Sequence, residues 1–131
     1  MSAAAQAQQK RVLIIDDDSS VLKLLSSALE RKSIVAAGAG NGADALAAVK
    51  ACRFDVIILD LGLPDIHGLE LIHKLRETTP DARVVIITAD TTSETLLRAI
   101  REQAFEYIRK PFDIREVVDI IQLAAGAIDE P

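Results

Sequence analysis

The stretch Arg11-Val-Leu-Ile-Ile-Asp-Asp-Asp18 decides which class of fold to expect. Its apolar part is continuous, rich in β-branched residues and of the length of a strand. Apolar runs of this kind, without polar residues in alternation, are typical of parallel strands that are buried on both faces. The run stops at an aspartate cluster, so the sequence predicts acidic side chains at the carboxyl end of a buried parallel strand.

Further apolar runs follow along the chain, and a helix-like segment separates each run from the next. The expected strands are residues 11–16, 33–37, 54–60, 83–88 and 105–109. The expected helices begin at Ser19 or Ser20, span 43–52, include 69–75 and 96–100, and follow a capping Asp113. This alternation predicts an α/β fold, in which helices cover both faces of a doubly wound, five-stranded parallel sheet.

The composition predicts one domain with an aliphatic core. The chain has 131 residues, of which 50% are hydrophobic and only 3% aromatic. Residues 1–9 are rich in Ala, Gln and Ser and are predicted to form a disordered tail, whereas residues 10–131 form the domain. The net charge of −5 argues against a nucleic-acid-binding module, since such modules usually carry a basic patch.

The cysteine content and the hydropathy together predict a cytoplasmic protein. Cys52 has no second cysteine for a disulfide, which indicates a reducing compartment, and it is expected to fill a buried or half-buried apolar position. No apolar run approaches the roughly 18 residues of a membrane span. The N-terminal segment lacks the basic and apolar regions of a secretion signal.

Polar residues that can carry chemistry stand where the predicted strands end. In a doubly wound sheet, the functional crevice lies outside the carboxyl ends of the strands. Those ends carry Asp16, Asp17 and Asp18 after the first strand, Asp60 after the third, Thr88 after the fourth and Lys110 after the fifth. We therefore expect these side chains to meet at one edge of the sheet.

The residue types at this edge favour phosphoryl transfer. Clustered carboxylates repel one another unless a cation neutralises them, and an all-oxygen pocket suits Mg²⁺. Asp16 and Asp17 are the expected metal pair, and Asp18 is the expected helix cap. Lys110 and Thr88 can contact phosphoryl oxygens. Asp60 stands alone at its strand end and is the expected nucleophile, because aspartate can form an aspartyl-phosphate.

A set of short motifs between residues 11 and 128 carries a resemblance to a known family. The motifs are VLIIDDD (12–18), NG (41–42) with AL (45–46), DVIILD (55–60), LP (63–64) with Gly68, IITA (86–89) and YIRKPF (107–112). As a set, they resemble the receiver domain of bacterial two-component response regulators. The resemblance implies a flavodoxin-like fold with strand order 2-1-3-4-5.

The resemblance also implies roles for the residues at the strand ends. Asp60 would accept a phosphoryl group from a phosphohistidine on a sensor histidine kinase or a histidine phosphotransfer protein. Asp16, Asp17, Asp60 and the backbone carbonyl of Gly62 would bind Mg²⁺. Lys110 would bind the phosphoryl oxygens, and its peptide bond to the following proline would be cis, an isomer largely restricted to bonds that precede proline.

A switch is the further implication of the resemblance. Thr88 would move toward the phosphoryl group while Tyr107 swings inward. The face of the fourth helix, the fifth strand and the fifth helix would then signal to an output domain or target protein. The resemblance implies no direct contact with nucleic acid or membrane, and it leaves homodimer formation open. It implies self-catalysed phosphorylation and dephosphorylation at Asp60 rather than a dedicated enzyme.

Three alternatives stay open at the level of the sequence. A small phosphatase would use Asp16 as nucleophile, Asp18 as acid and base, and Lys110 for charge, but it leaves Asp60 and Thr88 without a role. A flavodoxin-like FMN module would need a phosphate loop and aromatic residues where the chain has aspartates. A degenerate receiver would serve only as an interaction platform.

Overall fold

The structure is a computed structural model that describes residues 9–89 and 94–126. The strands in this part of the chain are β1 (Arg11–Ile15), β2 (Val35–Ala39), β3 (Val56–Leu59), β4 (Arg83–Thr88) and β5 (Glu106–Arg109). The helices are α2 (Ser19–Glu30), α3 (Gly42–Ala51), α4 (Gly68–Thr78), α5 (Glu94–Arg101) and α6 (Ile114–Ala124). Neighbouring strands all pair in parallel, in the order β2-β1-β3-β4-β5.

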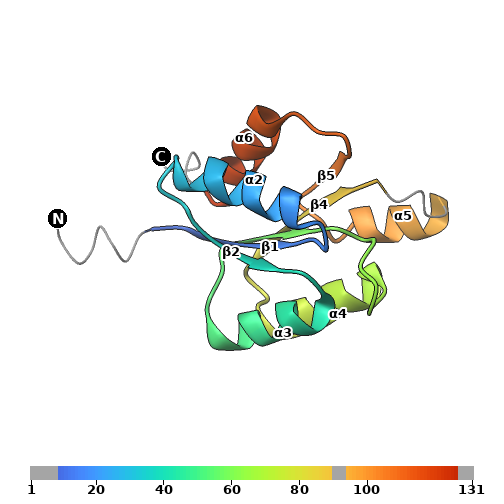
Figure 1. Ribbon diagram of the computed structural model, residues 1–131. Helices are drawn as coiled ribbons and strands as arrows, with labels where there is room; N and C mark the ends of the chain where they lie inside the picture. The colour runs from blue at the N-terminus through green and yellow to red at the C-terminus, as the bar shows by residue number, and fades with distance from the viewer. Residues whose placement is uncertain (1–8, 90–93, 127–131) are drawn as a thin grey trace.

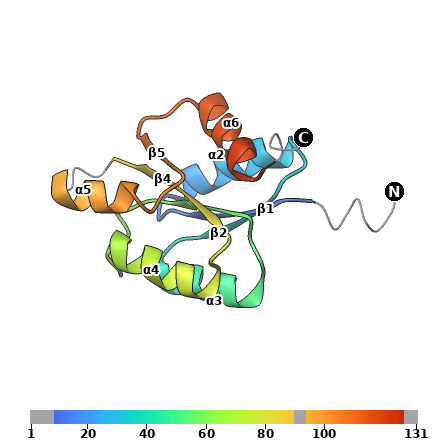
Figure 2. The same ribbon diagram turned by 180° about the vertical axis from the view of Figure 1, so that it is seen from behind.

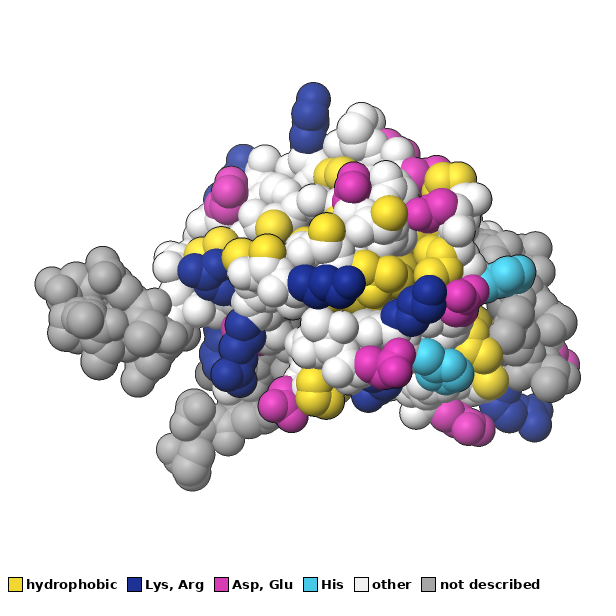
Figure 3. Space-filling model, turned by 90° about the horizontal axis from the view of Figure 1, so that it is seen from below, with side chains coloured by type: hydrophobic (Ala, Val, Ile, Leu, Met, Phe, Trp, Pro, Cys, Tyr) yellow, Lys and Arg dark blue, Asp and Glu magenta, His cyan; other side chains and the backbone are white. Residues whose placement is uncertain are grey.

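Helices cover both faces of the sheet, as the two opposite views show (Figures 1 and 2). Helices α2 and α6 lie on one face, whereas α3 and α4 lie on the other. The surface over α3 and α4 carries charged and histidine side chains around a band of hydrophobic ones (Figure 3). The predicted α/β fold, with its doubly wound parallel sheet and its flavodoxin-like strand order, is confirmed.

Side chains of the central strands alternate between two aliphatic clusters, one on each face of the sheet. In β1, Leu13 and Ile15 belong to the cluster that includes residues of α3 and α4, whereas Val12 and Ile14 belong to the cluster of α2 and α6. The alternation follows from the two-residue period of a strand. Because both faces are buried, the strand reads as a continuous apolar run in the sequence.

The starts of helices α2 and α6 are capped by side-chain oxygens. Asp18 caps α2 by accepting a hydrogen bond from the amide of Ser20 over 2.8 Å, as the sequence predicts. Asp113 caps α6 by accepting a hydrogen bond from the amide of Arg115 over 2.9 Å, as the sequence predicts. Such caps satisfy amides that the first turn of a helix leaves unpaired.

Two local expectations from the sequence are wrong. Strand β2 begins at Val35 rather than Ser33, because Ser33 adopts a left-handed conformation (φ 62°) in the turn after α2. The small residues of this segment give a weak strand pattern, which explains the shifted boundary. Cys52 is exposed rather than buried, since it lies just after the end of α3.

The predicted disordered tail at 1–9 lies almost wholly outside the described residues, as do 127–131 of the predicted domain. The tail and the domain boundary therefore stay predictions. Among the helices in the described ranges, none is long and apolar enough to cross a membrane.

The packing of α2 on the sheet predicts different effects for two adjacent leucines. Leu25 is fully buried, whereas Leu24 is 50% exposed. We expect Leu25→Ala to lower the free energy of unfolding by about 2–5 kcal/mol, because the buried cavity it leaves cannot fully collapse. Leu24→Ala is the matched control and should change it by less than about 0.5 kcal/mol. Urea unfolding followed by circular dichroism measures both values, and equal losses would contradict this packing of α2.

Candidate functional site

The sheet places the predicted site residues at one edge, directly beyond the ends of its strands. The amide of Asp60 donates to the carbonyl of Ile15 over 2.9 Å, and the amide of Lys110 donates to the carbonyl of Thr88 over 3.1 Å. Asp16 follows β1 in the same way. These bonds continue the parallel pairing past the strand ends, so the backbone that carries each side chain is fixed by its neighbour.

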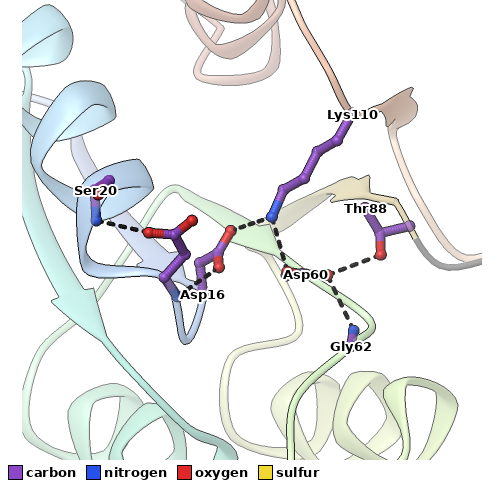
Figure 4. A network of polar contacts seen from close by, with 7 residues as sticks. Asp16, Ser20, Asp60, Gly62, Thr88 and Lys110 are labelled. Atoms are coloured by element: carbon purple, nitrogen blue, oxygen red, sulfur yellow. Dashed lines mark hydrogen bonds and ion pairs between the residues drawn. The ribbon is translucent and has the colours of Figure 1, made fainter.

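Lys110 lies between two carboxylates from different strands (Figure 4). Its Nζ atom is 2.7 Å from Asp16 Oδ2 and 2.9 Å from Asp60 Oδ2. The side chains of Asp16 and Asp60 are only 4% and 9% exposed, so their charges are removed from most of the solvent. A buried carboxylate is strongly unfavourable without a paired charge, and Lys110 supplies that charge to both. The peptide bond between Lys110 and Pro111 is cis, as the resemblance implies.

The second oxygen of Asp60 is also held by hydrogen bonds. Asp60 Oδ1 accepts a hydrogen bond from the hydroxyl of Thr88 over 2.8 Å and another from the amide of Gly62 over 3.0 Å. Thr88 is itself buried at the end of β4. The carboxylate of Asp60 therefore faces a hydroxyl, an amide and an ammonium that come from three other parts of the chain.

These contacts push the pKa values of the two buried aspartates in opposite directions. Burial is the largest effect on Asp60 and raises its pKa, but the hydrogen bonds from Gly62, Lys110 and Thr88 together outweigh it and leave the pKa below its ordinary value. For Asp16, burial outweighs the hydrogen bonds from Lys110 and the amide of Asp18, so the pKa is raised. Asp60 is therefore the better stabilised anion at neutral pH.

Lys110 also responds to this pair of carboxylates. Burial lowers its pKa, but the hydrogen bonds to Asp16 and Asp60 raise the pKa by more than burial lowers it. The net pKa therefore lies above its ordinary value. The ammonium therefore keeps its charge at neutral pH and remains available for an anion.

The aspartate cluster has the chemistry of a site for a hard cation. Asp16, Asp17 and Asp60 each offer a carboxylate oxygen, and these oxygens lie within 4.8 Å of one another. Asp17 is exposed. The amide of Asp18 donates a hydrogen bond to Asp16 Oδ1 over 2.9 Å and orients the Asp16 carboxylate. All-oxygen donor sets with one or two carboxylates are the ligands that Mg²⁺ prefers, so the residues present fit this ion.

The second predicted switch residue, Tyr107, lies further back along the sheet. It is half-buried on β5 and pairs with Ile86, two positions before the Thr88 end of β4. The guanidinium of Arg101, in the last turn of α5, lies 4.9 Å from the centre of the Tyr107 ring. This cation–π contact joins α5 to β5.

Sequence reasoning missed one aspartate near the site. The carboxylate of Asp65, in the loop after β3, accepts hydrogen bonds from the amides of Gly42 and Ala43 at the start of α3. The partners are far apart in the chain, since Gly42 and Asp65 are separated by 23 positions. No local pattern reports such a distant cap, because helix-start signals are read within a few residues.

The structure argues against a phosphatase that uses Asp16 as the nucleophile and Asp18 as the acid and base. Both oxygens of Asp16 are engaged, by Lys110 and by the amide of Asp18. The carboxylate of Asp18 caps α2 through the amide of Ser20. In contrast, Asp60 is the carboxylate on which Thr88 and Lys110 converge.

Comparison with known proteins shows relatives that cover most of this chain. The chain is 33% identical over 108 residues to a DNA-binding transcriptional regulator, NtrC, of Azospirillum brasilense, which covers 82% of this chain and 22% of the relative. It is 38% identical over 96 residues to the probable transcriptional regulatory protein TcrX of Mycobacterium tuberculosis. That alignment covers 73% of this chain and 41% of the relative. The chain thus spans between about a fifth and two fifths of these relatives.

Solved structures show the same fold. A CheY-like response regulator receiver domain protein of Methanospirillum hungatei superposes with a TM-score of 0.83 at 27% identity, over 91% of this chain and 95% of that one. A response regulator of Burkholderia pseudomallei, solved with a phosphorylated aspartic acid and a calcium ion, superposes with a TM-score of 0.77 at 30% identity, over 92% and 71%.

A family model gives the assignment directly. The model described as the response regulator receiver domain matches residues 12–122. This range contains four strands completely, all of β1 except Arg11, and all the residues of the aspartate and lysine cluster. The chain therefore belongs to the response regulator receiver domains of two-component signalling.

Proposed function

We propose that Asp60 accepts a phosphoryl group from a phosphohistidine of a sensor histidine kinase or a histidine phosphotransfer protein. The observation that carries this proposal is the convergence of Lys110, Thr88 and the amide of Gly62 on the Asp60 carboxylate. These are a cation and two hydrogen-bond donors, which is what a transferred phosphoryl group needs around it. The lowered pKa of Asp60 supports the proposal, since only the anion is a nucleophile.

The proposed step is a displacement at phosphorus. A carboxylate oxygen of Asp60 attacks, a phosphorus–oxygen bond forms and the phosphorus–nitrogen bond of the phosphohistidine breaks. The bonding electron pair stays on the imidazole nitrogen, which takes a proton from water. Lys110 then contacts a phosphoryl oxygen in place of the carboxylates, and the Thr88 hydroxyl donates to another. Water attack on the same acyl phosphate reverses the modification, so the chain catalyses both steps on itself and is not a dedicated enzyme.

The cluster is proposed to hold Mg²⁺ during this reaction. Asp16, Asp17 and Asp60 would supply carboxylate oxygens, and Gly62 would supply its backbone carbonyl. When bound, Mg²⁺ neutralises charge on the phosphoryl oxygens and on the carboxylates that face them. The Asp16 carboxylate would gain from such an ion, because burial raises its pKa more than the hydrogen bonds from Lys110 and the amide of Asp18 lower it.

The face formed by α5, β5 and α6 is the proposed route of the signal to an output domain or target protein. The acyl phosphate adds charge next to Thr88, and a shift of Thr88 toward it frees space for Tyr107. The contact between Arg101 and Tyr107 lies on this face and must change when the ring moves. Relatives named as DNA-binding regulators suggest that a separate domain contacts DNA in such proteins. A cytoplasmic location and homodimer formation stay predictions.

Replacing Asp60 by Asn tests the phosphoacceptor. We expect Asp60→Asn to abolish the addition of one phosphoryl group from acetyl phosphate, because the amide is not a nucleophile. Intact-mass spectrometry measures the adduct, with and without a chelator to test the need for Mg²⁺. Asp113→Asn, which alters only a helix cap, is the control and should still be phosphorylated. An adduct that persists in Asp60→Asn would assign the modification to another residue.

Replacing Lys110 by Gln tests the electrostatics of the site. The lowered pKa of Asp60 means that its anion contributes stability at neutral pH, and this contribution is lost as the pH falls through the folded-state pKa. Without the ammonium, we expect the pKa of Asp60 to rise and this acid-sensitive contribution to shrink. Phosphorylation should slow by about a hundredfold, as for the loss of one transition-state donor.

The titration is followed on the carboxyl carbon of Asp60 by NMR in metal-free protein. Lys74→Gln is the matched control, because Lys74 pairs with Glu70 over 3.4 Å on the exposed side of α4. It should leave both the titration and the rate unchanged. An unchanged pKa of Asp60 in Lys110→Gln would contradict the assigned role of the ammonium.

A further inference from the structure

The loop that follows Asp60 is tied to a helix that has no part in the site described so far. This loop, residues 61–67, connects β3 to α4. In its middle, Asp65 Oδ1 accepts a hydrogen bond from the amide of Gly42 over 2.9 Å, and Asp65 Oδ2 accepts one from the amide of Ala43 over 3.1 Å. Both amides belong to the first two residues of helix α3.

Helix α3 already has a cap of its own. The Asn41 side chain accepts a hydrogen bond from the amide of Asp44 over 2.8 Å, which is the usual arrangement at a helix start. Asp65 instead binds the first two amides, which a helix leaves unpaired, and it does so with a full negative charge at the positive end of the helix. The bond to Gly42 is the largest influence on the pKa of Asp65 and lowers it, so this carboxylate is ionised at neutral pH.

The start of α3 is shaped to receive the loop. A Cβ atom at Gly42 would lie 2.4 Å from Ile66 Cγ2 and 3.3 Å from Asp65 Oδ1, so only glycine lets the loop come this close. Gly42 is buried under the loop. The helix beneath is firmly placed, since Ala45 and Val49 are buried in the core on this side of the sheet.

The same loop carries the amide that binds the proposed phosphoacceptor. Gly62 lies three residues before Asp65, and its amide donates to Asp60 Oδ1 over 3.0 Å. Gly62 and Asp65 are both exposed, so burial holds neither of these two residues in place. The buried neighbours Leu61 and Leu63 fix the apolar side of the loop only. The two hydrogen bonds of Asp65 are thus its polar anchor.

We propose that Asp65 is a positioning residue that anchors the 61–67 loop to the start of α3 and thereby holds Gly62, a proposed Mg²⁺ ligand, against Asp60. This inference rests on the proposed function, because it concerns the Mg²⁺ and phosphoryl site at Asp60. The two hydrogen bonds are charge-assisted and lead to a rigid helix. They fix the middle of the loop, which its attachments to β3 and α4 at the two ends would leave free to move. By linkage, Mg²⁺ binding that orders Gly62 would also order the amides of Gly42 and Ala43.

The test separates an anchor of the site from an ordinary helix cap. Asp65→Ala removes the anchor, and Asn41→Ala removes the local cap of the same helix without touching the loop. Asp65→Asn keeps one acceptor oxygen and should give an intermediate result. In the full chain, NMR measures hydrogen exchange of the Gly62 amide without metal and the amide shifts during a titration with MgCl₂.

We expect Asp65→Ala to weaken Mg²⁺ binding about tenfold, the lower end of the effect of losing a partner that orients a metal ligand. Exchange of the Gly62 amide in metal-free protein should become faster by a similar factor. Asn41→Ala should lower the melting temperature but leave Mg²⁺ affinity within twofold and the Gly62 amide unchanged. Should Asp65→Ala fail to fold, Asp65→Asn carries the same comparison.

Equal behaviour of Asp65→Ala and Asn41→Ala, with the Gly62 amide and Mg²⁺ affinity unaffected in both, would reduce Asp65 to a helix cap and overturn the inference. Failure of the proposed function looks different, since the wild-type chain itself would then show no Mg²⁺-dependent phosphorylation that is lost in Asp60→Asn. The exchange of the Gly62 amide needs no metal and decides the anchoring role in that case as well.

Discussion

The ion pair of Lys110 with Asp16 and Asp60 is the interaction on which the site depends. Two carboxylates with less than a tenth of their side-chain surface exposed would repel each other, and one ammonium at 2.7 and 2.9 Å compensates both. The compensation is uneven, because Asp60 has further donors from Thr88 and Gly62, whereas Asp16 has the amide of Asp18. This asymmetry leaves Asp60 as the favoured anion and Asp16 as the carboxylate with most to gain from a cation.

The parallel sheet makes this ion pair possible. Its three members come from the ends of β1, β3 and β5, and the two most distant, Asp16 and Lys110, are 94 residues apart in the chain. Backbone hydrogen bonds that continue past the strand ends fix Asp60 against Ile15 and Lys110 against Thr88. The aliphatic clusters on both faces hold the strands in register, so the burial that stabilises the fold also sets the distances in the site.

The sequence predicts the site residues that stand at strand ends, and it misses side-chain contacts between different structural elements. Asp16, Asp60 and Thr88 each end an apolar run, and Lys110 directly follows the short strand β5. A parallel sheet necessarily gathers such strand ends at one edge. The contact of Asp65 with α3 and that of Arg101 with Tyr107 give no such signal, since neither partner follows a periodic pattern. The predicted start of β2 is wrong for a related reason, because the small residues of this segment give little hydrophobic contrast.

The network around Asp60 contains the donors that the proposed acyl phosphate requires. Lys110 and Thr88 contact the carboxylate in the structure, so the proposed phosphorylation would redirect existing donors and would not have to recruit new ones. Such preorganisation lowers the cost of reordering the site during the reaction. It also couples the chemistry to the fold, because Thr88 moves only if β4 or its side chain yields. The half-buried Tyr107 on the neighbouring strand β5 and the Arg101 contact on its ring are then the nearest elements that can respond.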